Sequence, residues 1–366
     1  MISMDNKMTK ENGIKVRLVD IAAAAGVSAS AVSKALKNSP EIPPATRKKI
    51  LDTANALGYR PNFIARSLRL GRTNLLGILI PDNTNPYYSC ILKGIETKGR
   101  ALGFTTIIAN TNENADDEAD ALSTFQSLPV DGILTVPVSF ENYAAVTTPL
   151  VFLSRYPLPK THSSQDAGSD NNYVMSDDRK GQYLAASHLI ECGIRDIYIF
   201  LDESDSRFVS GAKTQIRLSG FQSALADAGY KFEKTHVIYQ ISTFEAAFRA
   251  VSELCVRAKP PFGICLTNDA VAIGALNAIH ACNLRIPEDV QVVGYDDIDL
   301  SQFLVPPLTT VHSAKQSIGE AGVSLIRDII NSESQQRAKA HMVFEPFLVQ
   351  RSSTKPLSSA ESPQKE

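Results

Sequence analysis

The segment that most constrains the fold of this chain is LVDIAAAAGVSASAVSKAL, residues 18–36. It contains two short helical patterns on either side of Gly26-Val27, and the first is rich in alanine, the strongest helix former. Gly26 suits the left-handed position just past a helix end, and Ser28 is a good N-cap for the second helix. This spacing predicts a helix-turn-helix, which places its second helix in the major groove of DNA. An ordinary helical hairpin in a protein core is the alternative.

The two predicted helices should share a small apolar core and leave one face of the second helix outward. The expected core residues are Ile21, Ala25, Val27, Val32 and Leu36. The expected outward residues are Ala29, Ser30, Ser33, Lys34 and Lys37. These outward residues are small or basic, as a surface that reads base edges in a groove requires.

The charge of the chain is divided unevenly along its length. Residues 1–72 hold 13 Lys and Arg against 5 Asp and Glu, a net charge of +8. The remaining residues hold 24 and 34, a net charge of −10, so the whole chain of 366 residues carries only −2. A basic head that contains a helix-turn-helix predicts that the head binds a polyanion, whereas the acidic body does not.

Several classes of protein are disfavoured by what the sequence lacks. The five cysteines show no CxxC spacing, their odd number speaks against a disulfide framework, and the six histidines form no metal motif. No GxSxG, P-loop or GxGxxG motif is present. No apolar run reaches ~18 residues, and the polar N-terminus lacks the apolar stretch of a signal peptide. We therefore predict a cytoplasmic protein with no catalytic residues, no metal, no cofactor and no membrane segment.

The chain divides by composition into five expected parts. They are a disordered tail at residues 1–15, a helix-turn-helix domain at 16–61 with a third helix at about 46–57, a short hinge helix at 62–73, a large domain at 74–350, and a disordered polar tail at 351–366. The polar segment 163–172, SSQDAGSDNN, is expected to be a loop of the large domain.

From residue 75 onward, short apolar runs typical of buried strands alternate with helical patterns. The expected strands are residues 75–80, 104–109, 132–136, 150–153, 173–175, 197–201, 237–239, 262–266 and 290–294. Helices are expected between them, for example at residues 87–102, 180–191, 213–228, 244–257 and 270–281. Apolar strands joined by crossover helices predict parallel sheets that are covered on both faces. Nine strands are too many for one compact doubly wound unit of the usual size, so we expect two lobes.

Polar residues follow four of these strands at their carboxyl ends, where open α/β sheets bind ligands. They are Asp82, Asn85, Tyr87, Tyr88, Ser154, Arg155, Asn268, Asp269, Asp296 and Asp297, with Arg217 early in a helix. Carboxylates and amides bind hydroxyl groups, and aromatic rings stack on C–H surfaces, so the set predicts a neutral, polyhydroxylated ligand. For Asp82, Asp269 and Asp297, a role in a turn or helix cap is the preferred alternative.

The order of several motifs resembles that in the LacI/GalR family of bacterial transcription regulators. The likeness is carried by VRLVDIAAAAGVSASAVSKALKNS, ATRKKILDTANALGYRPNFIARSLR, LLGILIPDNTNPYY, GILTVPV, RLSGF, LTNDAVAIGAL and IPEDVQVVGYDDIDLSQFLVPPLTTV. It spans about residues 16–351, and NPYY and GYDDIDLSQFLVPPLTT are most similar to ribose-repressor-like members. The resemblance implies a small all-α helix-turn-helix head with a hinge helix, followed by a two-lobed, periplasmic-binding-protein-like effector domain of parallel, doubly wound α/β sheets.

The same resemblance implies a homodimeric regulator of sugar uptake or catabolism genes, most simply a repressor. Its implied partners are a palindromic double-stranded DNA operator and a small sugar-like effector bound between the lobes. The positions implied for DNA are Arg17, Leu18, Ser28, Ala29, Ser30, Ser33, Lys34, Thr46, Tyr59, Asn62, Ala65 and Leu68. Those implied for the effector are Asn85, Tyr87, Tyr88, Ser154, Arg155, Arg217, Asn268 and Asp296. Leu68 matches the leucine that wedges into a central base step of the minor groove.

Three positions depart from the family pattern. Pro43 stands where a serine usually caps the third helix, Ser154 replaces a frequent aspartate, and Ser313 replaces a frequent glutamine. The exact sugar is therefore open, and a nucleobase, nucleoside or sugar phosphate is an alternative effector. A transport binding protein of the same fold and a sugar-acting enzyme are further alternatives, although the basic head argues against the first. The tail lacks apolar heptads, so no tetramer is expected.

Overall fold

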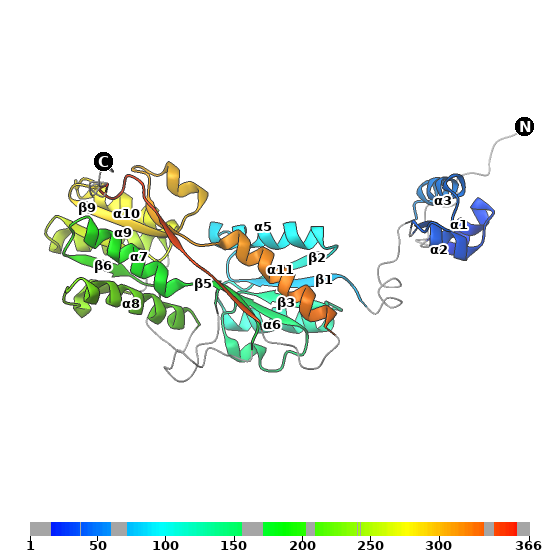
Figure 1. The fold of residues 1–366 in the computed structure, drawn as a ribbon, viewed down its shortest axis with the longest axis horizontal. Helices are drawn as coiled ribbons and strands as arrows, with labels where there is room; N and C mark the ends of the chain where they lie inside the picture. The colour runs from blue at the N-terminus through cyan, green and yellow to red at the C-terminus, as the bar shows by residue number, and fades with distance from the viewer. Residues whose placement is uncertain are drawn as a thin grey trace, which may run out of the picture. The chain divides into compact units, whose positions relative to one another are not determined.

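The computed structural model describes residues 16–36, 38–59, 72–155, 171–202, 209–239, 241, 243–332 and 340–356. The chain forms two compact units, Met1–Thr73 and Asn74–Glu366 (Figure 1). The predictions for the N-terminal tail, for nearly all of the hinge helix and for residues 163–170 of the polar loop lie outside the described residues. No single described helix is long and apolar enough to cross a membrane, and α1 and α2 (below) meet that criterion only as a pair bent by 104°.

The head contains the predicted helix-turn-helix. Its helices are α1 (Leu18–Ala25), α2 (Ala29–Leu36) and α3 (Pro44–Ala56). Gly26 follows α1 in the left-handed conformation, with φ of 68°, and the N–H of Ala31 donates to Oγ of Ser28 over 3.1 Å. Both local signals in the turn therefore act as predicted. Pro43 precedes α3 without a side-chain cap, as its departure from the family pattern implies.

The core of the head forms between all three helices. Ile21 and Val32 are fully buried, as predicted, and Ile50 of α3 is buried against them. Val27 and Leu36, which we also expected in the core, are only partly buried and pack at its edge. Ile50 and Ala54 of α3 are buried in the same cluster, so the third helix completes this core.

The larger unit contains two six-stranded sheets, one in each lobe (Figure 1). The first-lobe sheet has the order β11 (His341–Phe344), β5 (Tyr173–Ser176), β4 (Leu150–Leu153), β3 (Gly132–Thr135), β1 (Leu75–Ile80) and β2 (Thr105–Asn110). The second-lobe sheet has the order β12 (Phe347–Val349), β10 (Thr309–His312), β9 (Val290–Asp296), β8 (Phe262–Cys265), β6 (Ile197–Phe200) and β7 (Val237–Ile238). All pairings are parallel except that of β10 with β12, which is antiparallel.

Helices cover both faces of each sheet, as the parallel strands require. In the first lobe, α5 (Pro86–Ala101) and α11 (Lys315–Asn331) cover one face and α6 (Ala115–Ser127) the other. In the second lobe, α7 (Asp178–Glu191) and α8 (Val209–Asp227) lie opposite α9 (Phe244–Arg257) and α10 (Asp269–Ala281). Short 3-10 helices occur at η1 (Phe140–Tyr143), η2 (Lys234–His236) and η3 (Asp299–Phe303). The predicted fold class is confirmed.

The C-terminal part of the chain departs from the predictions. Strands β10, β11 and β12 and helix α11 were not expected. The tail was predicted to be disordered from residue 351, which is wrong for residues 351–356. Ser353 is fully buried, and its Oγ donates to the carbonyl of Val292 over 2.6 Å and accepts from the N–H of Thr309 over 2.8 Å. The tail is polar because its side chains bond to backbone groups, which composition alone does not reveal.

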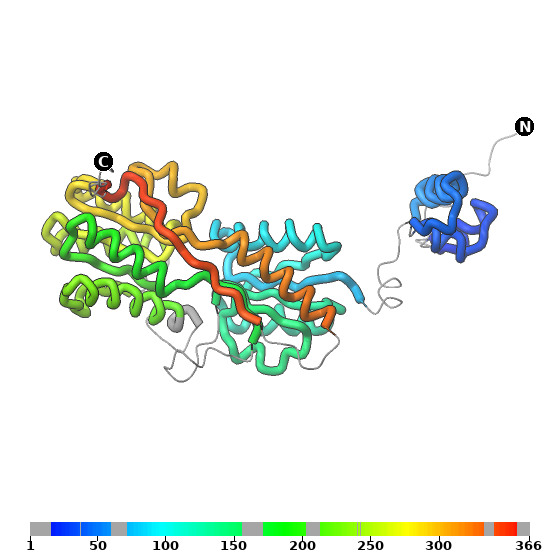
Figure 2. Tube along the Cα trace, in the orientation of Figure 1, coloured from blue at the N-terminus to red at the C-terminus, as the bar shows by residue number. Residues whose placement is uncertain are grey.

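Three segments connect the two lobes. They are residues 176–178 between β5 and α7, residues 312–315 between β10 and α11, and residues 344–347 between β11 and β12. Figure 2 shows the last of them as part of a C-terminal path, drawn in red, that runs across both lobes. The first and third segments are bonded to each other, because the N–H of Asp177 donates to the carbonyl of Phe344 over 3.0 Å.

Candidate functional site

A cavity of about 430 Å³ lies between the two lobes, a volume in the usual range for small-molecule sites. It is lined by Asp82, Asn85, Tyr87, Tyr88, Glu113, Val138, Arg155, Asp202, Lys213, Thr214, Arg217, Thr267, Asn268 and Asp296. Seven of the eight positions predicted for the effector are in this set, and Ser154 is not. The carboxyl ends of strands from both sheets therefore converge on one space, as the strand-end rule predicts.

The first-lobe side of the cavity is organised around Arg155, whose side chain is 8% exposed. Its guanidinium donates two parallel hydrogen bonds to the carboxylate of Glu113, over 2.7 and 3.0 Å. It also donates to the hydroxyl of Tyr88 over 2.9 Å and to the carbonyl of Pro137 over 3.0 Å. Burial opposes ionisation of Glu113, but the charge of Arg155 outweighs it and holds the pKa of that carboxyl below its usual range.

Tyr87 and Tyr88 lie in the first turn of α5 and meet edge to face, with ring centroids 5.2 Å apart. Asn85 fixes this helix start, because its side chain accepts from the N–H of Tyr87 over 3.0 Å. The hydroxyl of Tyr87 lies 2.6 Å from Oγ of Ser154, which is buried behind it. Ser154 thus supports Tyr87, which lines the cavity, but Ser154 is not itself a lining residue. Its direct contact with an effector stays a prediction. Burial raises the pKa of both tyrosines, so their hydroxyls stay neutral.

The second-lobe side is organised around Arg217 of α8. Its Nε and Nη2 donate to one carboxylate oxygen of Asp178 over 3.0 and 2.9 Å, and its Nη1 donates to the carbonyl of Thr267 over 2.8 Å. The guanidinium also lies over the ring of Tyr295, 4.4 Å from its centroid. Lys213 forms a second ion pair with Asp178 over 3.4 Å. Burial raises the pKa of Asp178, but these two cations outweigh it and lower the pKa overall.

Asp202 and Asp296 form no ion pair with any cation of the described residues, although both line the cavity. From the residues that the structure describes, Asp202 accepts one hydrogen bond, donated by Oγ1 of Thr267 over 3.2 Å. Burial raises the pKa of both carboxyls. The two arginines in the cavity are therefore held by protein acceptors, whereas two carboxylates retain acceptor positions that no described residue occupies. Such a site suits a ligand that donates several hydrogen bonds and carries no negative charge.

Six lining residues were not selected from the sequence. They are Glu113, Val138, Asp202, Lys213, Thr214 and Thr267. Glu113 and Asp202 follow β2 and β6 closely, so the strand-end rule, had it been applied to every strand, would have identified both. Asp82 lines the cavity, but it also forms the expected turn, because its carboxylate accepts from the N–H and hydroxyl of Thr84 over 2.8 and 2.7 Å.

The described DNA-contacting candidates of the head lie in its three helices or next to their ends. Arg17, Ser28, Ser30 and Lys34 are exposed, and Leu18, Ala29, Ser33, Thr46 and Tyr59 are partly buried. Lys34 forms an ion pair with Glu41, in the turn that follows α2. Lys37, Asn62, Ala65 and Leu68 lie outside the residues whose placement is described. Ser30 and Lys34 therefore remain the most accessible candidates on α2 for contacts with bases.

Comparison with known proteins identifies the head and the body independently. Residues 17–62 match the bacterial regulatory proteins of the lacI family, and residues 186–354 match the periplasmic binding protein-like domain. The HTH-type transcriptional regulator DegA of Bacillus subtilis (strain 168) is 31% identical over 348 residues, which cover 94% of this chain and all of DegA. The chain belongs to the lacI family of bacterial regulatory proteins. As a member of this family, it is a DNA-binding transcription regulator.

Two further matches agree with this lacI-family assignment. The ribose operon repressor of Escherichia coli (strain K12) is 29% identical over 336 residues, which cover 91% of this chain and 98% of that protein. The crystal structure of the Lac repressor dimer bound to operator and the anti-inducer ONPF has the same fold, with a TM-score of 0.79 and 22% identity. That alignment covers 93% of this chain and 99% of the Lac repressor chain. The family resemblance and the two-lobed architecture predicted from the sequence are both confirmed.

Proposed function

We propose that this lacI-family protein is a homodimeric repressor that binds a palindromic operator and is controlled by a sugar-like effector in the cavity between its lobes. The observation that carries the effector assignment is the set of acceptor positions on Asp202 and Asp296 that no described residue occupies, in a cavity whose two arginines are already bonded to protein groups. Hydroxyl groups of a sugar satisfy such acceptors without bringing a negative charge. The similarity to a ribose operon repressor supports the same class of ligand.

The effector would contact both lobes at once. Tyr87 and Tyr88 supply an aromatic wall on the first-lobe side, and Asn268 and Asp296 supply polar groups on the second-lobe side. A ligand that bridges two lobes favours the lobe orientation in which all its contacts are made. It changes operator affinity only by its differential affinity for the two orientations, typically about 1–3 kcal/mol.

In the head, we propose that α2 lies in the major groove and that Lys34 exchanges its ion pair with Glu41 for the O6 and N7 atoms of guanine. The methyl group of Ala29 is proposed to contact thymine. Leu68 is proposed to wedge into a central base step of the minor groove, as the family resemblance implies. We expect a cytoplasmic protein without catalytic activity, because its proposed partners are an operator and an effector that it binds but does not convert.

A nucleobase or nucleoside effector is the second candidate. The edge-to-face pair of Tyr87 and Tyr88 offers aromatic surface against which a base could pack. A sugar phosphate fits less well, because Arg155 and Arg217 are bonded to carboxylates and Lys213 is paired with Asp178. Recognition of a phosphate dianion would require some of these ion pairs to break.

A thermal-shift screen of pentoses, hexoses, their phosphates, nucleosides and nucleobases tests the effector assignment. A ligand that binds only the native protein at 100 times its Kd adds about 2.7 kcal/mol of stability. We expect neutral sugars to give the largest shifts. Shifts from nucleosides or nucleobases alone would favour the second candidate, and turnover of a bound ligand would contradict the proposal that the protein is not an enzyme.

Titration of genomic DNA fragments at two salt concentrations tests the operator assignment. The basic head should bind with a log K that falls by about 0.9 per phosphate contact for each unit of log salt. We also expect a palindromic fragment to bind more tightly than the others. Equal affinity for all fragments at both salt concentrations would contradict specific binding.

A further inference from the structure

The backbone at the end of β9 has an unusual conformation beside the cavity. Asp296 and Asp297 have φ values of 102° and 54°, two consecutive positive values in residues that carry side chains. Residues with a Cβ rarely occupy this region, and they persist there only where surrounding contacts hold them. Asp296 lines the cavity, so the conformation of this backbone sets the direction in which its carboxylate points.

Lys315 holds this backbone from the start of α11, where the chain passes from the second lobe into the first. Its side chain is buried, and its Nζ donates to the carbonyl of Asp296 over 2.6 Å and to the carbonyl of Asp297 over 2.7 Å. A buried ammonium is costly unless it is hydrogen-bonded, so these two contacts resist separation. Lys315 does not line the cavity, and it therefore acts on Asp296 through the main chain.

Lys315 is the first residue of α11, a helix of the first lobe. This helix packs closely against α5, because Gly94 and Gly319 have no side chain where the two backbones meet. A Cβ on Gly94 would lie 2.2 Å from the carbonyl of Gln316, and one on Gly319 would lie 2.2 Å from the carbonyl of Ile91. The first turn of α5 carries Tyr87 and Tyr88, which line the cavity. The side chain of Lys315 therefore connects the backbone of Asp296 to the packed helices α5 and α11.

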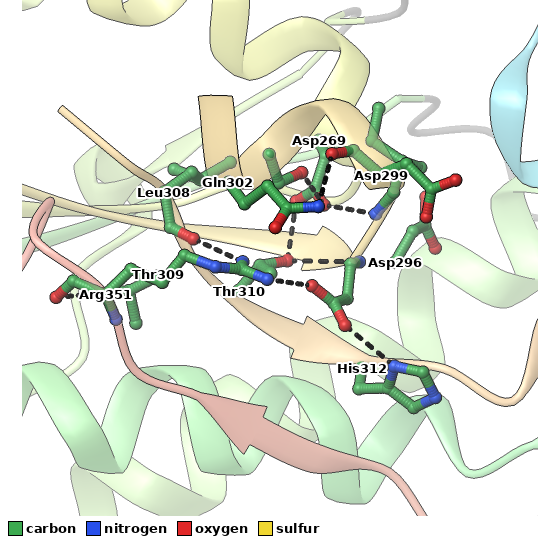
Figure 3. Close-up of polar contacts among 12 residues, drawn as sticks. Asp269, Asp296, Asp299, Gln302, Leu308, Thr309, Thr310, His312 and Arg351 are labelled. Carbon is green, nitrogen blue, oxygen red and sulfur yellow. Dashed lines mark hydrogen bonds and ion pairs between the residues drawn. The ribbon is translucent and has the colours of Figure 1, made fainter. Parts of the chain in front are cut away.

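The other anchors of this segment come from the second lobe (Figure 3). The carboxylate of Asp297 lies 2.9 Å from Nδ1 of His312 and accepts from Nη2 of Arg351 over 2.6 Å. Asp269 accepts from the N–H of Ile298, and the hydroxyl of Thr310 donates to it over 2.6 Å. Of the anchoring side chains described here, Lys315 alone lies on a first-lobe helix. The second-lobe anchors fix the segment within its own lobe, and Lys315 fixes it to the other.

We propose that Lys315 is the positioning residue that couples Asp296 to the orientation of the two lobes. With Lys315 in place, a change in the angle between the lobes moves the end of β9. A ligand that binds the carboxyl of Asp296 and shifts it also shifts the start of α11. Without it, the backbone of Asp296 relaxes and the lobes lose a direct connection at the cavity. The inference rests on the proposed function only where it treats Asp296 as an effector contact.

Two variants and a control test this role in the full-length protein. Lys315→Met removes the ammonium and keeps an unbranched side chain that is one atom shorter, whereas Lys315→Arg keeps a cation with several donors. Gln316→Met is the control, because Gln316 is the exposed neighbour on the same helix and bonds only to Glu320 by its side chain. If Lys315→Met does not fold, Lys315→Gln, which retains one donor group, takes its place with a smaller change expected in the same direction.

The first measurement needs no effector. Donor and acceptor fluorophores at the exposed positions Arg100 on α5 and Glu253 on α9 report the distance between the lobes. In Lys315→Met, the width of the distance distribution should at least double, whereas Lys315→Arg and Gln316→Met should stay close to the unaltered protein. An unchanged distribution in Lys315→Met would overturn the proposal, whether or not any sugar binds.

The second measurement uses the sugar that gives the largest thermal shift in the screen. Lys315→Met should weaken its binding by at least tenfold, although no lining residue has been changed, and Lys315→Arg should recover most of the loss. Affinity equal to that of Gln316→Met would contradict the proposal. A screen that finds no ligand would count against the proposed function alone, because the distance measurement still decides the role of Lys315.

Discussion

The cavity contains two buried arginines, one from each lobe, whose carboxylate partners differ in exposure. The side chains of Arg217 and Asp178 are 6% and 5% exposed. Arg155 is similarly buried at 8%, but its partner Glu113 is 46% exposed. Solvent therefore screens the first-lobe pair and leaves the second-lobe pair almost unscreened. Both pairs join an arginine to a carboxylate. Because of the difference in exposure, loss of the carboxylate should destabilise the second-lobe side of the cavity much more than the first-lobe side.

The largest expected effect comes from breaking the buried pair. Asp178→Asn leaves Arg217 and Lys213 without a carboxylate partner in a buried site, which should cost about 3–5 kcal/mol of unfolding free energy. Urea denaturation of the full-length variant measures this loss. Asp328→Asn is the control, because it breaks an exposed pair with Arg327 and should change little. Equal losses in the two variants would show that burial does not separate these pairs.

The next effect concerns Asp296, a buried carboxylate without a cation partner among the described residues. Asp296→Asn removes a group whose ionisation is opposed by burial, so the unfolding free energy should not fall at neutral pH. Binding of a sugar effector should weaken by about 1–3 kcal/mol, because the amide group that replaces one carboxyl oxygen leaves a sugar hydroxyl without its acceptor. Calorimetry and operator binding with and without the sugar measure this. A normal response to the same sugar concentrations would show that this cavity is not the control site.

A smaller effect is expected from the half-exposed pair. Glu113→Gln removes a carboxylate that water also solvates, so the loss should be about 1 kcal/mol. Comparison of its urea midpoint with that of Asp178→Asn measures the difference between the two lobes. If Glu113→Gln were as destabilising as Asp178→Asn, the bidentate geometry of Arg155, and not burial of the carboxylate, would control the stability of these pairs.

The smallest effect is a difference in pH dependence between the two pairs. Arg155 and Arg217 lower the pKa values of Glu113 and Asp178 below their ordinary values of 4.5 and 3.8, even though burial opposes this. Each pair therefore contributes its full stability above the ordinary value and loses it as the pH falls toward the folded-state pKa. As the pH falls, the difference in unfolding free energy between the unaltered protein and Glu113→Gln should begin to decrease at a higher pH than the difference between the unaltered protein and Asp178→Asn. Unfolding free energies measured across the acidic range check the order, which the reverse result would contradict.

Much of the fold was predictable because it depends on local signals. The helices at residues 18–25 and 244–257 were predicted with the bounds that the structure shows, and the nine expected strands are all present within a few residues. Strands β11 and β12 were missed because they carry little local signal. The side chains of β11 are mostly exposed, and its partner β5 lies far away in sequence, with His341 opposite Tyr173. Pairing at such separation is decided by the assembled sheet.

The site divides in a similar way between local chemistry and assembled contacts. By itself, the sequence determined the helix-turn-helix, the parallel strands and the polar residues at their carboxyl ends, because periodicity, caps and turns act over a few residues. Only the tertiary structure decided which charges are paired. Arg155 meets Glu113 across 42 residues, Arg217 meets Asp178 across 39, and Lys315 reaches the carbonyls of Asp296 and Asp297 from the start of α11. The strength of these contacts depends on the distance between the charges and on their burial, and both are properties of the folded chain that the type of residue does not determine.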